Sequence, residues 1–406
     1  MSEAIINRSP DLIKLQSEDY RIEICSGYLI VHYIPYLNKN KEIKSGTLVM
    51  ALANSGNITI KPKDHTAYFI GEQPCNIDGS FVTSLVNSPQ KQNLYANVVS
   101  DFYLSCHPDD RVYADYYDKV TTYYNIISSP AINLDSEACR QLKKPLIVKN
   151  EDSPLVYTDT NASHSNTACF NDKFYPLKIA IIGAGGTGSY ILDFVSKTPV
   201  SEIHLFDADL FNTHNAFRAP GAASVEELEQ QLFKVEYLCK KYSQIHKGII
   251  PHKEYITQDN IASLKSMSYV FLCIDKVSVR NTIAGYLIDN EIPFINSGLG
   301  IGLSNCTLDG MVEITAAYKD HYSHIKEVFS GNDVKDDDMY ASNIQIAELN
   351  AMAAIYSIIK WKKMLGFYCD TKQEVRSVYS INDNDIYNGK DLSLIHISEP
   401  TRRTPI

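Results

Sequence analysis

Long hydrophobic runs and an excess of basic residues are both absent from this sequence of 406 residues. No segment approaches the ~18 apolar residues of a membrane-spanning helix, and the first residues lack the basic and apolar regions of a signal peptide. Lys and Arg total 38 against 48 Asp and Glu, a formal net charge of −10. Bulk electrostatics therefore does not favour nucleic acid or anionic membranes as partners. We expect a cytoplasmic protein without membrane contact.

Closely spaced cysteines are absent as well. Neighbouring cysteines are at least 30 positions apart, and their total of nine is odd. This spacing contains no C-x-x-C pair, so the sequence predicts neither a zinc knuckle nor a disulfide framework. The cysteines are expected to be reduced thiols, many of them buried.

The composition is that of a globular chain, with 44% apolar and 21% charged residues. Because single cores usually hold about 100–150 residues, we expect two domains. Residues 1–150 contain short β-type runs, separated by Gly, Asn and Pro, and a tyrosine-rich helical segment at 112–124 that favours core packing. This pattern predicts a smaller α+β domain. The polar stretch 151–172 lacks periodicity and is expected to be a linker.

Residues 173–390 alternate β-type runs with helical patterns, which favours a Rossmann-like α/β domain with a doubly wound, mostly parallel sheet. Strands are expected at 177–182, 203–206, 269–274 and 293–296, and helices at 190–196, 225–242, 277–289 and 344–365. Residues 391–406 resemble the translation of a sequencing-library adapter. We expect a non-native, disordered tail there.

A glycine-rich loop follows the first strand of the second domain. Gly183, Gly185, Gly186 and Gly188 open a helix, so backbone N–H groups can meet a phosphate at the helix N-terminus. Asp207 lies 24 residues after Gly183, at the end of the next strand, where its carboxylate can bind ribose hydroxyls. On these residues alone, an NAD-dependent oxidoreductase fits as well as an enzyme that binds ATP.

The polar residues after Asp207 distinguish between ATP and NAD as the bound nucleotide. Asn215 and Arg218 follow the second strand, Lys234 lies on the next helix, and Asp275 follows a later strand. Two cations and an amide can spread over a triphosphate, and a carboxylate can hold its Mg²⁺, whereas hydride transfer needs neither. This set therefore favours ATP and Mg²⁺ over NAD.

The ordered set resembles the ThiF family of adenylating enzymes, which includes the ubiquitin-activating enzymes, over residues 175–370. The resemblance implies phosphate binding by Gly183, Gly185, Gly186 and Gly188, ribose binding by Asp207, triphosphate contacts by Asn215, Arg218 and Lys234, Mg²⁺ binding by Asp275, and catalysis by Arg218, Lys234 and Asp275. Two departures are Ala219, where the family commonly has Gln, and the missing C-x-x-C zinc ligands. No zinc site is therefore expected.

The resemblance also implies a reaction and partners. The protein is expected to activate the C-terminal carboxylate of a ubiquitin-like or sulfur-carrier-like protein ending in glycine, and to form a homodimer. Residues 1–150 resemble the N-terminal region of a bacterial branch found beside ubiquitin-like and conjugating-enzyme-like proteins, so a conjugating-enzyme-like partner is also implied. Alternatives are adenylation of a peptide or of a tRNA-borne carboxylate, an NAD-dependent oxidoreductase, and an inactive protein that only binds ubiquitin-like partners.

Two further segments are candidate chemical sites. Cys306 is the only cysteine near the region where the family carries its thioester cysteine, and a buried structural thiol is favoured over a nucleophile there. The segment 319–340 contains His321, His324 and an acidic cluster around Asp333. Without further ligands at fixed spacing, a solvated crossover loop above the acceptor peptide is favoured over a metal site.

Overall fold

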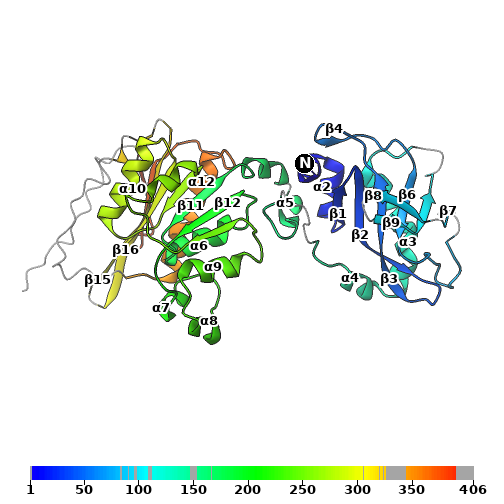
Figure 1. Ribbon diagram of the computed structural model, residues 1–406, viewed down its shortest axis with the longest axis horizontal. Helices are drawn as coiled ribbons and strands as arrows, with labels where there is room; N and C mark the ends of the chain where they lie inside the picture. Colours follow the sequence, from blue (N-terminus) through cyan, green and yellow to red (C-terminus); the bar gives the residue numbers. More distant parts are fainter. Residues whose placement is uncertain are drawn as a thin grey trace, which may run out of the picture. The chain divides into compact units, whose positions relative to one another are not determined.

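The computed structural model describes residues 2–82, 85–89, 91–95, 98–107, 112–146, 153–165, 167–304, 306–319, 321–322, 324–325 and 344–389. The tail at 391–406 lies outside these ranges. None of the helices in the described ranges is both long and apolar enough to span a membrane. The chain divides into two compact units, Met1–Lys149 with Tyr157–Asp172, and Asn150–Val156 with Lys173–Ile406 (Figure 1).

The first unit is built on an antiparallel sheet of order β1-β2-β3-β6-β10-β7, with two small hairpins, β4–β5 and β8–β9. The strands are β1 (Arg21–Cys25), β2 (Tyr28–Leu37), β3 (Ile43–Ala51), β4 (Asn54–Ser55), β5 (Ile58–Thr59), β6 (Thr66–Ile70), β7 (Val86–Ser88), β8 (Gln92–Tyr95), β9 (Val98–Ser100) and β10 (Phe102–Ser105). The helices are α1 (Ser2–Arg8), α2 (Pro10–Ser17), α3 (Tyr116–Leu134), α4 (Ser136–Gln141) and α5 (Thr160–His164). A small α+β domain was expected, and this prediction is confirmed.

Helix α3 forms the main helical side of this unit's core. Tyr116, Val120, Tyr123 and Ile127 recur at spacings of three and four and are fully buried. They belong to one cluster with the inward residues of the sheet. The tyrosine-rich segment therefore packs the core, as its pattern predicted.

The polar segment expected as a linker, residues 151–172, is shared between the two units. Asp159 caps the N-terminus of α5, and the buried Ser163 of that helix donates a hydrogen bond to Gln16 of α2. Leu155, in contrast, forms a β-bridge with the second unit. The segment thus contains ordered structure in both units.

The second unit contains an eight-stranded sheet of order β13-β12-β11-β14-β15-β16-β17-β18. Its strands are β11 (Lys178–Ile182), β12 (Glu202–Phe206), β13 (Ile249–His252), β14 (Tyr269–Leu272), β15 (Phe294–Ser304), β16 (Thr307–Ala317), β17 (Arg376–Ser380) and β18 (Ile386–Gly389). The helices are α6 (Gly186–Val195), α7 (Thr213–Ala216), α8 (Val225–Glu229), α9 (Lys234–Tyr242), η2 (Ile261–Ser266), α10 (Val277–Asp289) and α12 (Ala347–Met364), and the 3₁₀ helix η1 (Ala168–Lys173) ends at the boundary with the first unit. Strands β13, β12, β11, β14 and β15 run parallel to one another. Strands β16, β17 and β18 continue the sheet antiparallel.

Helices cover both faces of this sheet. Leu192 of α6, Val235 of α9 and Trp361 of α12 lie in the core of one face. Leu264 of η2 and Ile283 of α10 lie in the core of the other. The Rossmann-like, doubly wound, mostly parallel sheet predicted from the sequence is therefore confirmed (Figure 1).

The prediction of a single helix at 225–242 is wrong, because the structure has two helices there, α8 and α9. The capping box at Ser224 begins α8 as expected. The chain then turns at Gln231, whose φ is 48°, and Phe233 forms a bridge with Leu210. This break makes Lys234 the first residue of α9.

The cysteines differ in burial from the expectation. All nine thiols are free, but only Cys75 and Cys139 are buried. Cys306 is exposed at the turn between β15 and β16, with a φ of 60°. The preference for a buried structural thiol at this position was therefore wrong.

Candidate active site

The predicted site residues gather at the carboxyl ends of the parallel strands, where doubly wound folds bind ligands. The glycine loop follows β11, Asp207 follows β12, and Asp275 comes three residues after β14. A cavity of about 580 Å³ opens there. Its walls include these predicted residues: Gly183, Gly185, Gly186, Asp207, Arg218, Lys234 and Asp275. Gly188 and Asn215 do not line it.

The glycines of the loop serve different purposes. Gly183 has a φ of 95°, which favours glycine, and a Cβ there would lie 2.4 Å from the carbonyl oxygen of Cys273. A Cβ on Gly188 would lie 1.8 Å from the carbonyl oxygen of Gly183. Gly185 instead has open space around it and leaves the N-terminus of α6 without a side-chain cap. The outer glycines therefore permit packing, and Gly185 leaves the helix N-terminus open to the cavity.

A buried charge network surrounds Asp207. Its Oδ2 accepts a hydrogen bond of 2.8 Å from the Ala184 N–H, and its Oδ1 accepts one of 2.8 Å from the Asp209 N–H. Lys234 Nζ lies 3.5 Å from Asp207 Oδ1 and 2.5 Å from Asp209 Oδ2. Each carboxylate oxygen has two lone pairs, so Asp207 can still accept bonds from a ligand.

Asp209 contributes a second carboxylate beside Lys234. Burial alone would raise its pKa, but hydrogen bonds from Lys234 and Tyr255 hold the pKa below its usual value. The same contact with Asp209 raises the pKa of Tyr255 to about 12. The ammonium of Lys234 is thus held at the cavity wall by two carboxylates.

Two buried donors on the α7 segment lack hydrogen-bond partners within the described part of the chain. They are Asn215 Nδ2 and Arg218 Nε. The Asn215 side chain is also part of the fold, because its Oδ1 accepts a hydrogen bond of 2.9 Å from the Asn212 N–H. Buried donors without partners are costly, so Arg218, which lines the cavity, is suited to an anionic ligand, whereas Asn215 does not line it.

Asp275 lies on the cavity wall, close to Gln345 just before the start of α12. Gln345 Nε2 donates a hydrogen bond of 3.3 Å to Asp275 Oδ2. Arg280 lies one turn into α10; burial lowers the pKa of its guanidinium, and Glu313 and Asp275 oppose that shift. Burial also raises the pKa of the Cys273 thiol, which therefore favours its neutral form.

The sequence did not reveal several residues of the cavity wall. Tyr255, Ile256 and Thr257 follow β13, a four-residue strand with a proline that was not predicted. Lys276, Ser297, Leu299 and Gln345 also line the cavity. The carboxyl-end rule for parallel strands would have found the first group if β13 had been recognised.

No described residue of the other proposed chemical segments lines this cavity. The acidic cluster from Asp333 to Asp338 lies outside the described residues, as does most of the loop expected at 319–340. Cys306 lies seven residues beyond the cavity residue Leu299, roughly 20 Å along an extended strand. Across the described ranges, no three His, Cys, Asp or Glu residues cluster to hold a metal ion.

Helix α12 supports the glycine loop through Asn350. This side chain is fully buried, accepts a hydrogen bond of 2.9 Å from Thr187 Oγ1 and donates one of 2.9 Å to the Ile346 carbonyl. A Cβ on Gly186 would lie 2.4 Å from the Asn350 amide carbon. Asn350 therefore fixes the first turn of α6 from behind.

Replacing Asn350 by alanine is expected to weaken ATP binding about tenfold or more, because the half-buried hydroxyl of Thr187 loses its partner and the first turn of α6 loses its support. Equilibrium dialysis with labelled ATP measures this. Asn290→Ala is the matched control, since Asn290 makes the same bond to the carbonyl four residues earlier but is exposed. Equal ATP affinity in both variants would show that Asn350 does not position the loop.

A Rossmann-like domain with a glycine loop, cations and carboxylates around one cavity is typical of a nucleotide-binding domain. The chain belongs to the ThiF family, whose model matches residues 165–387. This membership confirms the resemblance seen in the sequence. Residues 10–160 match a family described as a domain of unknown function, DUF6791.

Similar proteins include tRNA threonylcarbamoyladenosine dehydratase of Escherichia coli strain K12, which is 26% identical over 134 residues. The match covers 31% of this chain and 47% of that protein, so it spans about half of the relative's length. Solved structures that resemble the chain include E. coli MccB with MccA-N7isoASN, with a TM-score of 0.43, 15% identity, and coverage of 57% of this chain and 69% of that one. Another is E. coli tRNA N6-threonylcarbamoyladenosine dehydratase, TcdA, with a TM-score of 0.40 and 18% identity. That match covers 51% of this chain and 93% of the TcdA chain.

Proposed function

We propose that this protein activates a carboxylate with ATP to form an acyl-adenylate. The observation that carries the proposal is the convergence of the glycine loop, Asp207, Arg218, Lys234 and Asp275 on one cavity. In the reaction, an oxygen of the acceptor carboxylate forms a bond to the α-phosphorus. The bond from this phosphorus to the oxygen that bridges to the β-phosphate breaks, and pyrophosphate leaves.

The residues of the cavity have the chemistry for this transfer. Asp207 accepts hydrogen bonds from ribose hydroxyls, the open N-terminus of α6 faces phosphate, and Arg218 and Lys234 offset the charge of the triphosphate. An ionised carboxylate needs no general base. The site's task is therefore to orient two anions and to stabilise charge on the phosphates.

Asp275 is proposed to hold Mg²⁺ together with phosphate oxygens. Mg²⁺ is commonly bound by one or two carboxylates and the substrate phosphates rather than by an all-protein cage. The donor set fits this mode, since Asp207 and Asp209 of the cavity wall pair with Lys234, which leaves Asp275 as the wall carboxylate that Lys234 does not contact, and no three-ligand cluster occurs in the described ranges. When bound, the metal would neutralise charge on the phosphates.

We propose further that the acceptor is an extended C-terminus, that of a ubiquitin-like or sulfur-carrier-like protein ending in glycine. Strand β15 pairs with β14 only over Phe294–Asn296. Within the described residues, the edge of β15 on that side has no strand partner from Ser297 to Ser304, and Ser297 and Leu299 line the cavity. An extended peptide that adds to this edge would bring its carboxylate into the site. A homodimer and a conjugating-enzyme-like partner stay predictions.

A second candidate acceptor is a carboxylate carried on tRNA. The similarity to a tRNA threonylcarbamoyladenosine dehydratase favours it. The net charge of −10 supplies no general attraction to RNA, so tRNA would need local contacts. Membership of the ThiF family favours ATP over NAD as the nucleotide, and so disfavours the NAD-dependent oxidoreductase.

ATP–pyrophosphate exchange tests these acceptors. We expect exchange with Mg²⁺ and a ubiquitin-like protein that has a free C-terminal glycine, and none when that carboxylate is amidated. Exchange with tRNA bearing threonylcarbamoyladenosine instead would assign the second acceptor. ATP binding without exchange for peptide, protein and tRNA carboxylates would reject carboxylate activation and favour a protein that only binds its partners.

A further inference from the structure

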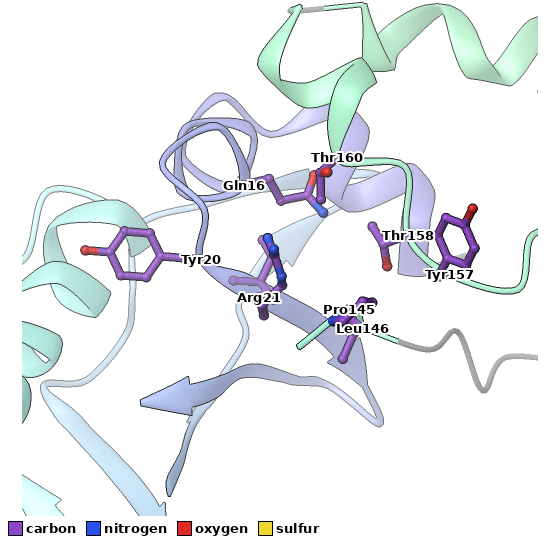
Figure 2. A pocket seen from close by; sticks show the side chains of 9 residues that line it. Gln16, Tyr20, Arg21, Pro145, Leu146, Tyr157, Thr158 and Thr160 are labelled. Carbon is purple, nitrogen blue, oxygen red and sulfur yellow. The ribbon is translucent and has the colours of Figure 1, made fainter. Parts of the chain in front are cut away.

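A second pocket lies within the first unit, and the proposed reaction does not use it. Its volume is about 230 Å³. It is lined by Gln16, Tyr20, Arg21, Ile22, Pro145, Leu146, Tyr157, Thr158 and Thr160 (Figure 2). None of these lining residues is acidic, and one carries a permanent positive charge. The pocket therefore offers hydrogen-bond donors and a cation beside apolar walls.

Gln16 presents a donor to this pocket from a buried position. Its side chain is 3% exposed, and its Oε1 accepts a hydrogen bond from Ser163 Oγ. Its Nε2 has no hydrogen-bond partner within the described residues, and Figure 2 shows the amide directed into the space beside Arg21. The contact with Ser163 holds the amide in place, so little ordering is needed when Nε2 donates to a ligand.

Arg21 is held in the same way. Its Nε donates a hydrogen bond of 3.3 Å to the Lys144 carbonyl, and its Nη1 donates one of 2.5 Å to Asp19 Oδ1. The remaining nitrogen, Nη2, has no hydrogen-bond partner in the described part of the chain. Asp19 does not cancel the local charge, because Lys143 Nζ also lies 3.4 Å from its other oxygen. Two cations thus share one carboxylate, which leaves a positive excess.

We propose that this pocket binds a carboxylate. A carboxylate has two oxygens in one plane, which suits donation by a guanidinium nitrogen on one side and an amide nitrogen on the other. The hydroxyls of Thr158 and Thr160 add donors, and Ile22 and Leu146 contact the apolar part of the ligand. The ligand is a small organic acid or an acidic residue of a peptide, since both present the same group.

Isothermal titration of the full chain tests the proposal. The probes are succinate, the blocked peptide acetyl-Gly-Glu-Gly-amide and inorganic phosphate. We expect a carboxylate probe to bind and Arg21→Gln to weaken it about tenfold or more, the usual worth of a charge-assisted hydrogen bond. Arg140→Gln is the matched control, because the Arg140 side chain is 72% exposed and, among the described residues, pairs only with Glu137 at the surface.

Gln16→Glu provides an independent variant if Arg21→Gln misfolds. It keeps the shape and the acceptor for Ser163 but places a negative charge in the pocket, so the carboxylate probe should again bind at least tenfold more weakly. Tighter binding of the peptide assigns the site to a protein partner, and tighter binding of succinate assigns it to a free acid. Equal binding of phosphate, no binding of either carboxylate, or unchanged binding in both variants overturns the proposal. Failure of ATP–pyrophosphate exchange does not bear on it.

Discussion

Asp275→Ala and Arg218→Ala are each expected to lower ATP–pyrophosphate exchange about 10²-fold or more, the usual loss when one preorganised charge contact is removed from a transition state. Both side chains line the cavity with the glycine loop. Arg218 Nε is buried without a partner in the described structure, so the fold places this cation beside the cavity without using all of its donors. The measurement is the exchange rate at saturating ATP, Mg²⁺ and acceptor.

Asp275→Asn separates charge from shape in this experiment. Asparagine retains an oxygen that can accept the hydrogen bond from Gln345, but it loses the negative charge that is proposed to hold Mg²⁺. We therefore expect Asn to be nearly as damaging as Ala. Asp385→Ala and Arg140→Ala, which change exposed residues, should keep normal exchange. Wild-type rates in both Asp275→Ala and Arg218→Ala would reject the proposed mechanism.

The sequence could predict those parts of the site that follow directly from strand order. The glycine loop and Asp207 come immediately after buried strands, and the ends of parallel strands meet at one edge of the sheet. Arg218 and Asp275 follow from the resemblance of their order along the chain to that of the ThiF family. Their convergence on one cavity agrees with that order.

Tertiary packing determines the features of the fold and site that sequence patterns do not predict. Asn350 supports the glycine loop across 163 residues of sequence from Thr187, and no local pattern encodes such a contact. The break at Gln231 overrides a continuous apolar periodicity, because the Phe233 bridge and the placement of Lys234 require a new helix start. Strand β13 was missed because its four residues include a proline, which pattern rules confine to edge strands, and β13 is indeed at the edge.

Among glycine-to-alanine substitutions in the second unit, Gly188→Ala is expected to lower the stability of the fold the most. The added Cβ would lie 1.8 Å from the carbonyl oxygen and 3.0 Å from the carbonyl carbon of Gly183. Both are backbone atoms, so no flexible side chain can yield, and α6 must move away from the loop that follows β11. Overpacking of this kind costs about 3 kcal/mol or more. We expect a clear fall in Tm and loss of measurable ATP binding.

Gly185→Ala is the matched control, because it adds the same methyl group three residues earlier in the loop. Gly185 has a φ of −76° and no atom within 4 Å of an added Cβ, so the Tm should stay at the wild-type value. The new methyl group would nevertheless project at the cavity wall, so ATP affinity should fall. Thermal unfolding and ATP binding measured on both variants therefore separate the two uses of glycine. Normal Tm and ATP binding in Gly188→Ala would contradict the described packing of α6 on its loop.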